Sequence, residues 1–337
     1  MPIFIRSNPS SYFLPIFGTG VDGDVVISSN TDLPSTLNGD IVYKNYRNLT
    51  INPGCTLSVS NRCKGLWIRV RGTLVLNGTI SMTGKAPTLG SNGSDLYLCY
   101  SDIKVPAIGA AGGARVNTIN SPGNPGGNGV DGQCGGGGSG GFHPYDWGTD
   151  VYSGAGAAGF SAGGGSGGSG AGATTNYTTR ENGIDGLPYG GNGGNGVGGN
   201  AFASGGGAGG DGSIGGKGTC DYNYYYAGGG SAGSGGVLII MANRIEGSGS
   251  LLSNGANGGW AWNAPGGGAG DGGAGGGGGS GGGSITLYYL SSSAVWPMNV
   301  SGGAGGSGAG GAGNGGAGGA GSYRYYSMQQ LASHTRI

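Results

Sequence analysis

Residues 301–322 read SGGAGGSGAGGAGNGGAGGAGS, and this stretch decides the fold. It contains only Gly, Ala, Ser and Asn, so it cannot build a conventional apolar core. Glycine supplies 92 of the 337 residues, and most of them follow Ala111. Such a composition is typical of a flexible linker. Either an unusual interaction orders these tracts, or they are disordered.

The rest of the composition argues against a disordered chain. The sequence has 15 basic and 15 acidic residues and as many as 18 tyrosines, and short apolar blocks return after each glycine-rich tract. Disordered chains are usually highly charged and poor in aromatic residues. We therefore expect the glycine tracts to be ordered.

A three-residue period in the glycine tracts indicates how they are ordered. A polyproline-II helix has three residues per turn and no internal hydrogen bonds, so its backbone groups can pair with neighbouring helices. Glycine lets such backbones approach closely, and one small residue in three can face outward. The period slips twice within 301–322, which predicts short polyglycine-II helices that fold back on one another. The three phases hold Ser301, Ala304 and Ser307; Ala309 and Ala312; and Asn314, Ala317 and Ala320.

Short strands dominate the first third of the chain. Apolar or alternating runs bounded by Asn, Gly and Pro are typical of strands. The expected strands are 24–28, 41–43, 49–51, 56–59, 66–70, 73–76 and 79–82.

An internal repeat links these strands to the glycine-rich part. The segment 65–87 has the same strand–turn–strand pattern as 236–259, with 284–306 as a weaker copy and 94–114 as a candidate fourth. One such unit cannot bury its own apolar face, so the copies are expected to stack as in a solenoid.

Together these patterns predict an all-β fold. It comprises a β-rich N-terminal region, either a β-solenoid or sandwich-like, and stacked strand repeats into which a polyglycine-II bundle is inserted. The expected divisions are 1–20 (attachment segment), 21–111 (β-rich domain), 112–322 (glycine-rich region with strand repeats at 236–255 and 284–300) and 323–337 (C-terminal tail).

Charge and hydropathy disfavour several partners. A balanced charge without Lys or Arg clusters gives no reason to expect nucleic acid. Apolar runs fall short of the ~20 residues that cross a bilayer, and the first residues lack the pattern of a signal peptide. The five cysteines are widely spaced, so we expect neither a disulfide framework nor a metal site.

The motifs for chemistry are weak. GxGxxG matches arise by chance at this glycine content, and Gly216–Lys217 lacks the remaining residues of a P-loop. The calcium-binding pattern GGxGxD occurs at 126–131 and 206–211, but not in tandem. Neither His143 nor His334 lies in a local nucleophile signature. We expect no enzyme activity and no cofactor.

Clusters of large side chains interrupt the glycine tracts. These islands are 141–152, 174–189, 220–226 and 260–263. They have the character of loop tips displayed by a scaffold, because clustered exposed aromatics usually mark interaction sites. The alternative is that the aromatics seal the ends of the bundle.

The chain resembles glycine-rich bacteriophage virion proteins. Segments such as DGDVVISSNTDLP (22–34) and NLTINPGCTLSV (48–59) are similar to their β-rich opening. Glycine tracts alternating with islands over 112–321 resemble the tip adhesins of T-even-like long tail fibres, in which a polyglycine-II bundle carries receptor-contacting loops.

This resemblance implies a role in host attachment. It implies a virion protein that is assembled in the host cytoplasm and acts at the host cell surface. The implied partners are other virion proteins through the N-terminal region and a host glycan or outer-membrane protein. Assembly into a homo-oligomer stays open. The implied receptor-binding residues are His143, Tyr145, Trp147, Tyr177, Arg180, Tyr224, Tyr225, Trp260 and Trp262.

Other functions stay open at this point. The chain could be a purely structural filament, capsid or tail decoration subunit whose aromatics pack against other subunits. An ice- or surface-binding bundle would require a flat, regular face. Mycobacterial-type glycine-rich surface proteins are a further analogue, but their helical N-terminal module is missing.

Overall fold

The fold is known from a computed structural model with side chains. It describes residues 16–87, 110–115, 121–131, 133–140, 155–156, 159, 163–164, 167, 234–260, 275–293, 296–308 and 313–328, together with six two-residue strands. These strands are β8 (Leu96–Tyr97), β9 (Lys104–Val105), β10 (Gly172–Ala173), β11 (Arg180–Glu181), β12 (Ala203–Ser204) and β13 (Thr219–Cys220).

Two parallel sheets form the body of the protein, which we call the β stack. The seven-stranded sheet contains β1 (Asp24–Ile27), β3 (Val42–Tyr46), β4 (Asn48–Ile51), β6 (Leu66–Leu76), β14 (Val237–Glu246), β16 (Ser284–Ser292) and β18 (Ser322–Ser327). The five-stranded sheet contains β2 (Thr31–Leu33), β5 (Thr56–Val59), β7 (Thr79–Ser81), β15 (Ser250–Leu252) and β17 (Met298–Asn299). The predicted all-β fold is therefore confirmed.

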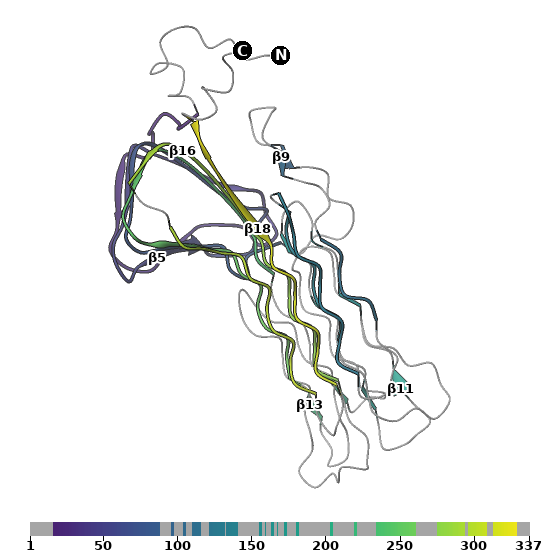
Figure 1. Cartoon of the computed structure of the whole chain (residues 1–337). Coiled ribbons are helices and arrows are strands. Elements are labelled where there is room, and N and C mark those ends of the chain that lie inside the picture. The colour runs from purple at the N-terminus through teal and green to yellow at the C-terminus, as the bar shows by residue number, and fades with distance from the viewer. Residues whose placement is uncertain are drawn as a thin grey trace, which may run out of the picture.

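The chain alternates between the two sheets, so each circuit adds one coil to the stack. Figure 1 looks along the stack, where the strands superimpose around a wedge-shaped core. Equivalent side chains of successive coils form columns: Leu66, Leu238 and Ile285 are neighbours in register, and all three are fully buried. Because each coil covers the apolar face of the next, the predicted repeats at 65–87, 236–259 and 284–306 do stack.

Some sequence predictions need correction. The predicted strands 66–70 and 73–76 are one strand, β6, and the short strand β2 was missed. The candidate fourth repeat at 94–114 is wrong, because β8 and β9 within it pair only with each other, antiparallel. Residues 323–327, assigned to a C-terminal tail, belong to β18 of the large sheet.

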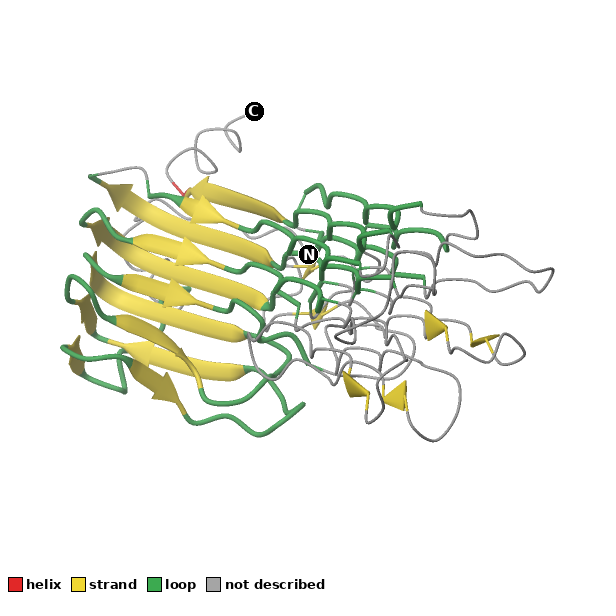
Figure 2. Ribbon diagram, turned by 90° about the horizontal axis from the view of Figure 1, so that it is seen from below, coloured by secondary structure: helices red, strands yellow, loops and turns green. Residues whose placement is uncertain are grey.

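The glycine tracts leave the stack at one corner. The first two returns from the small sheet to the large sheet, 34–41 and 60–65, are short. After β7, β15 and β17 the chain instead runs out into long glycine-rich excursions before re-entering at β14, β16 and β18. Figures 1 and 2 show these excursions as parallel rods beside the stack.

We call these rods the glycine lattice, and hydrogen bonds at every third residue hold them together. Segments 275–283 and 313–321 run parallel, with Gly276, Gly279 and Gly282 donating from their amides to the carbonyls of residues 313, 316 and 319. This spacing is the one that polyproline-II helices require. It supports the predicted polyglycine-II form, which stays a prediction.

Segments of the lattice that follow one another along the chain run antiparallel, because the chain folds back between them. Segments 300–308 and 313–321 are antiparallel, since Gly315, Gly318 and Gly321 donate to residues 306, 303 and 300. This is the self-paired arrangement predicted from the slipping period. Segment 275–283 also pairs antiparallel with 253–260, through Gly277 and Ser280.

The lattice continues the ladders of the stack. The parallel strands β16 and β18 begin with the pair Ser284 and Ser322. In the glycine segments that lead into these strands, the amide of Gly282 donates to the carbonyl of Gly319. Similarly, Leu251 donates to Pro297 near β15 and β17, and Gly255 donates to Ser301 further out. Each coil of the stack therefore extends into a layer of the lattice, as Figure 2 shows.

Burial separates the inner from the outer segments. Every residue of 275–283 is buried, and this segment consists of eight glycines and Ser280. In the outer segment 300–308 only one phase is exposed, at Ser301, Ala304 and Ser307. In 313–321, Asn314 and Ala317 are exposed, while Ala320 is half-buried. Side chains occur where they can face outward, as the sequence predicted.

Backbone contact explains why the other phases are glycine. A Cβ added at Gly305 would overlap the carbonyl oxygen and carbon of Gly315, and one at Gly279 would overlap the carbonyl of Gly303. These obstacles are main-chain atoms of neighbouring segments, so they cannot move aside as a flexible side chain could.

We predict that Gly305→Val destabilises the lattice by at least about 2 kcal/mol, in the range of overpacking. The matched control is Ala304→Val, since this neighbouring side chain is exposed and its replacement should change stability by no more than about 0.5 kcal/mol. Chemical denaturation of both variants measures the difference. Equal stabilities would show that the backbones of 300–308 and 313–321 do not pack as described.

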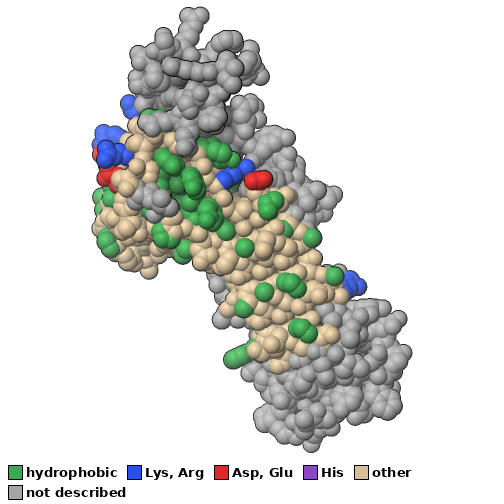
Figure 3. All heavy atoms as spheres, viewed as in Figure 1, with side chains coloured by type: hydrophobic (Ala, Val, Ile, Leu, Met, Phe, Trp, Pro, Cys, Tyr) green, Lys and Arg blue, Asp and Glu red, His purple; other side chains and the backbone are tan. Residues whose placement is uncertain are grey.

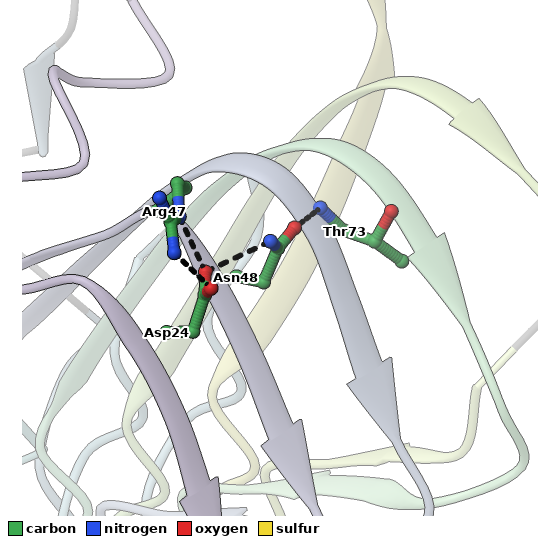
Figure 4. A network of polar contacts seen from close by, with 4 residues as sticks. All are labelled: Asp24, Arg47, Asn48 and Thr73. Atoms are coloured by element: carbon green, nitrogen blue, oxygen red, sulfur yellow. Dashed lines mark hydrogen bonds and ion pairs between the residues drawn. The ribbon is translucent and has the colours of Figure 1, made fainter.

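Polar side chains join the first coils at a bend of the large sheet (Figure 4). Arg47 Nε donates to Asp24 Oδ1 over 2.8 Å, a second Arg47 nitrogen donates to Oδ2, and Asn48 Nδ2 donates to Oδ1 over 2.9 Å. Asn48 Oδ1 in turn accepts from the amide of Thr73 at 2.9 Å. The hydrogen bonds from Arg47, and then Asn48, lower the pKa of Asp24 to about 2.

This network predicts an acid-sensitive contribution to stability. Because the pKa of Asp24 is lower in the folded chain than its ordinary value of 3.8, the contribution is complete above that value and is lost as pH falls toward 2. Asp24→Asn should flatten the dependence of the thermal midpoint on pH in this window. Asp32→Asn on β2 is the control, and an equal effect of both would contradict the role of this network.

Candidate functional site: the far end of the glycine lattice

The far end of the lattice is the place where the chain turns through its islands. Segment 253–260 starts at the stack, where the Ser253 hydroxyl donates to the Gly236 carbonyl over 2.6 Å. Trp260 lies seven residues further along, which is about 22 Å at the rise of a polyproline-II helix. The returning segment starts again at 275, antiparallel to it. The island 260–263 therefore begins at the end remote from the stack.

Backbone hydrogen bonds fix the base of this island. Gly258 donates to the carbonyl of Ala304 over 2.8 Å, and the carbonyl of Gly259 accepts from Gly277 at 3.0 Å. Trp260 follows directly, with 60% of its side chain exposed. A large apolar side chain is thus held at the edge of a rigid support with most of its surface in solvent.

The island 141–152 begins in an equivalent place. Segment 133–140 starts near the stack, where Cys134 packs in a cluster with Val237 and Trp67, and its other end is Gly140. All residues from 134 to 140 are buried. This island therefore also leaves from the remote end of an inner segment.

Two further islands adjoin short antiparallel strand pairs. Gly172 and Ala173 of β10 pair antiparallel with Glu181 and Arg180 of β11, so β10 directly precedes the island 174–189 and β11 lies within it. β12 and β13 form a second antiparallel pair just before 221–226. Figure 1 shows β11 and β13 at the end of the molecule opposite the stack.

Of the predicted receptor-binding residues, the structure thus places the Trp260 side chain and the backbone of Arg180. The others lie outside the described residues: His143, Tyr145, Trp147, Tyr177, Tyr224, Tyr225 and Trp262.

Sequence reasoning missed one feature that organises this site, the contrast between the two ends of the lattice. Close to the stack, residues 130–133 form a tight turn: Gln133 donates to the carbonyl of Val130 over 2.9 Å, and Asp131 has a positive φ of 48°. The longer connections 141–154 and 261–274 leave from the other end. The lengths of the islands were a signal that could have shown this.

The described part of the chain contains neither a cluster of metal-binding side chains nor a helix that could cross a membrane. No group of three or more His, Cys, Asp or Glu side chains there could hold a metal ion. Burial raises the pKa of the Cys134 thiol to about 12, so this cysteine stays protonated and serves packing. No helix among the described residues is long and apolar enough to cross a membrane.

Comparisons with known proteins give no family. No protein-family model, curated protein or solved structure matches this chain. Functional inference therefore rests on the geometry.

The exposure of Trp260 predicts that it contributes little to folding. Trp260→Ala should change the free energy of unfolding by no more than about 0.5 kcal/mol, as for other surface positions. Trp67 is 3% exposed, and its replacement by Ala should lower the free energy of unfolding by about 3–5 kcal/mol. Denaturation curves of the two variants test this, and a large loss in Trp260→Ala would identify it as a packing residue.

Proposed function

We propose that this chain is a non-enzymatic bacteriophage virion protein that displays aromatic loops for attachment to the host cell, as tail-fibre or tail-tip adhesins do. The observation that carries the proposal is the support of Trp260: a main-chain lattice holds it about 22 Å from the stack, largely exposed. Tyr and Trp suit this task, because their faces bind sugars and anchor protein contacts.

In this arrangement the main chain of the lattice provides cohesion, and the side chains of the islands are left for recognition. Cohesion of the lattice depends on main-chain hydrogen bonds, so residues in the islands can vary without disturbing the support. Binding loops are commonly carried by rigid scaffolds in this way. In this proposal the N-terminal region of the chain joins it to other virion proteins.

The proposal predicts that the islands carry the binding energy. The double variant Trp260→Ala/Trp262→Ala should retain its fold but bind less, since an aromatic anchor is worth on the order of 2 kcal/mol. Labelled protein is incubated with a panel of bacteria and with their isolated envelopes, and the bound fraction is measured. Val26→Ala, which replaces an exposed apolar side chain on β1 of the stack, is the matched control.

A purely structural role is the second candidate. It is favoured by the exposed tyrosines of β18, which give the stack an open end. Under this role no strain or envelope fraction binds the wild-type protein, and replacement of the tryptophans impairs incorporation into particles.

A further inference from the structure

We propose that the β18 end of the stack is a docking surface for a second copy of this chain, paired through antiparallel β18 strands across a two-fold axis. The inference is independent of the proposed host attachment.

The first observation is an open strand edge. β18 pairs with β16 on one side and is the last strand of the large sheet. Among the residues that the structure describes, no strand pairs with the other edge of its six residues, so these main-chain groups can pair with another strand. Edge strands in monomeric proteins are usually guarded by charges, prolines or covering segments.

The second observation is an open core. Tyr323 is the register neighbour of Ile285, and Tyr325 of Leu287, so both tyrosines continue fully buried apolar columns. No described strand of the small sheet covers them, and their exposed fractions are 50% and 56%. Figure 3 views the molecule from this end and shows hydrophobic side chains gathered over the centre of the stack.

The opposite end of the stack, formed by β1 and β2, has a buried core and charged edge strands. There the inward residues Ile27 and Leu33 are 6% and 7% exposed, so the core is closed. The edge strands β1 and β2 each carry an exposed aspartate, Asp24 and Asp32. One end therefore has a closed core and an exposed aspartate on each edge strand, whereas the other has an open core and Arg324 as the charged residue of its edge strand, so the β18 end is the one suited to a partner.

Charge does not oppose self-association at this end. Within residues 296–308 and 313–328 the single charged side chain is Arg324. Its side chain lies on the face of the strand opposite to Tyr323 and Tyr325, because successive side chains of a strand alternate. There the guanidinium donates to the Asp131 carbonyl over 3.1 Å and lies 6.0 Å from the ring of Tyr326. Two such faces can therefore meet without burying unpaired charges on the side of Tyr323 and Tyr325.

The position of the lattice selects the antiparallel arrangement. β18 runs away from the lattice, because segment 313–321 leads directly into it. An antiparallel partner strand consequently carries its own lattice on the opposite side. If the two-fold axis is perpendicular to the sheet, both open cores lie on the same side of the paired strands. The tyrosines of the two copies then cover each other.

The outer surface of the lattice disfavours stacking of one lattice on another. Its outward phase carries side chains, including Ser301, Ala304 and Ala317, where inner segments have glycine. A second lattice laid on this surface could not approach to main-chain hydrogen-bonding distance. The antiparallel pair avoids this obstacle, since the two lattices do not meet.

Sedimentation across a concentration series tests the proposal on the full chain. We expect a monomer–dimer equilibrium, and the double variant Tyr323→Lys/Tyr325→Lys should raise its dissociation constant at least about tenfold by placing charges in the joint core. Val26→Lys is the control, because Val26 is 61% exposed at the other end. Far-UV circular dichroism and thermal midpoints confirm that each variant is folded.

Single cysteines along β18 test the orientation. In a Cys99→Ser/Cys220→Ser background, one of Tyr323→Cys, Arg324→Cys, Tyr325→Cys and Tyr326→Cys should form a disulfide between copies, because in an antiparallel pair the residue nearest the two-fold axis faces its own copy. A wild-type protein that stays monomeric at every concentration would overturn the proposal, as would a dimer insensitive to the lysine variant. A dimer in which none of the four cysteines forms the disulfide, or a ladder of larger species, would exclude the antiparallel pair.

Discussion

Close approach of main chains is the interaction on which the whole structure depends. In the glycine lattice, carbonyls of one segment occupy the space that a Cβ would need on the next, as at Gly305 and Gly315. Each amide that gains a partner there contributes only about 0.5–1.5 kcal/mol net. The contribution accumulates because the donors recur at every third residue and the inner segment 275–283 is buried throughout.

Such a lattice needs a template, and the β stack provides it. An isolated glycine segment loses more conformational entropy on ordering than any other sequence. Here the segments start from strands already in register, so Gly282 meets Gly319 just before Ser284 meets Ser322. The apolar columns of the stack thus set the layer spacing, and the lattice extends it without an apolar core of its own.

The sequence predicted local features of this fold well but not its layering. Strand positions such as 56–59, and the outward phase of Ser301 and Ala304, follow from side-chain patterns that are visible in single segments. Which segments become neighbours does not, because glycine tracts offer identical main chains and many equivalent registers. β18 was missed since its tyrosines and polar residues lack neighbours in sequence that mark a strand, and only pairing with β16 defines it. For the site, the island 260–263 was predicted from composition, whereas its distance from the stack depends on the pairing of 253–260 with 275–283.

This separation of roles affects how the protein tolerates change. In an ordinary domain the same side chains build the core and shape the surface, so altering a loop often disturbs packing. Here the core of the stack contains Leu66, Leu238 and their neighbours, and the lattice depends on the absence of side chains. The largely exposed side chain of Trp260 therefore belongs to neither source of cohesion. A substitution of Trp260 thus meets few structural constraints, while Gly279 or Gly305 cannot accept even a methyl group without displacing a neighbouring main chain.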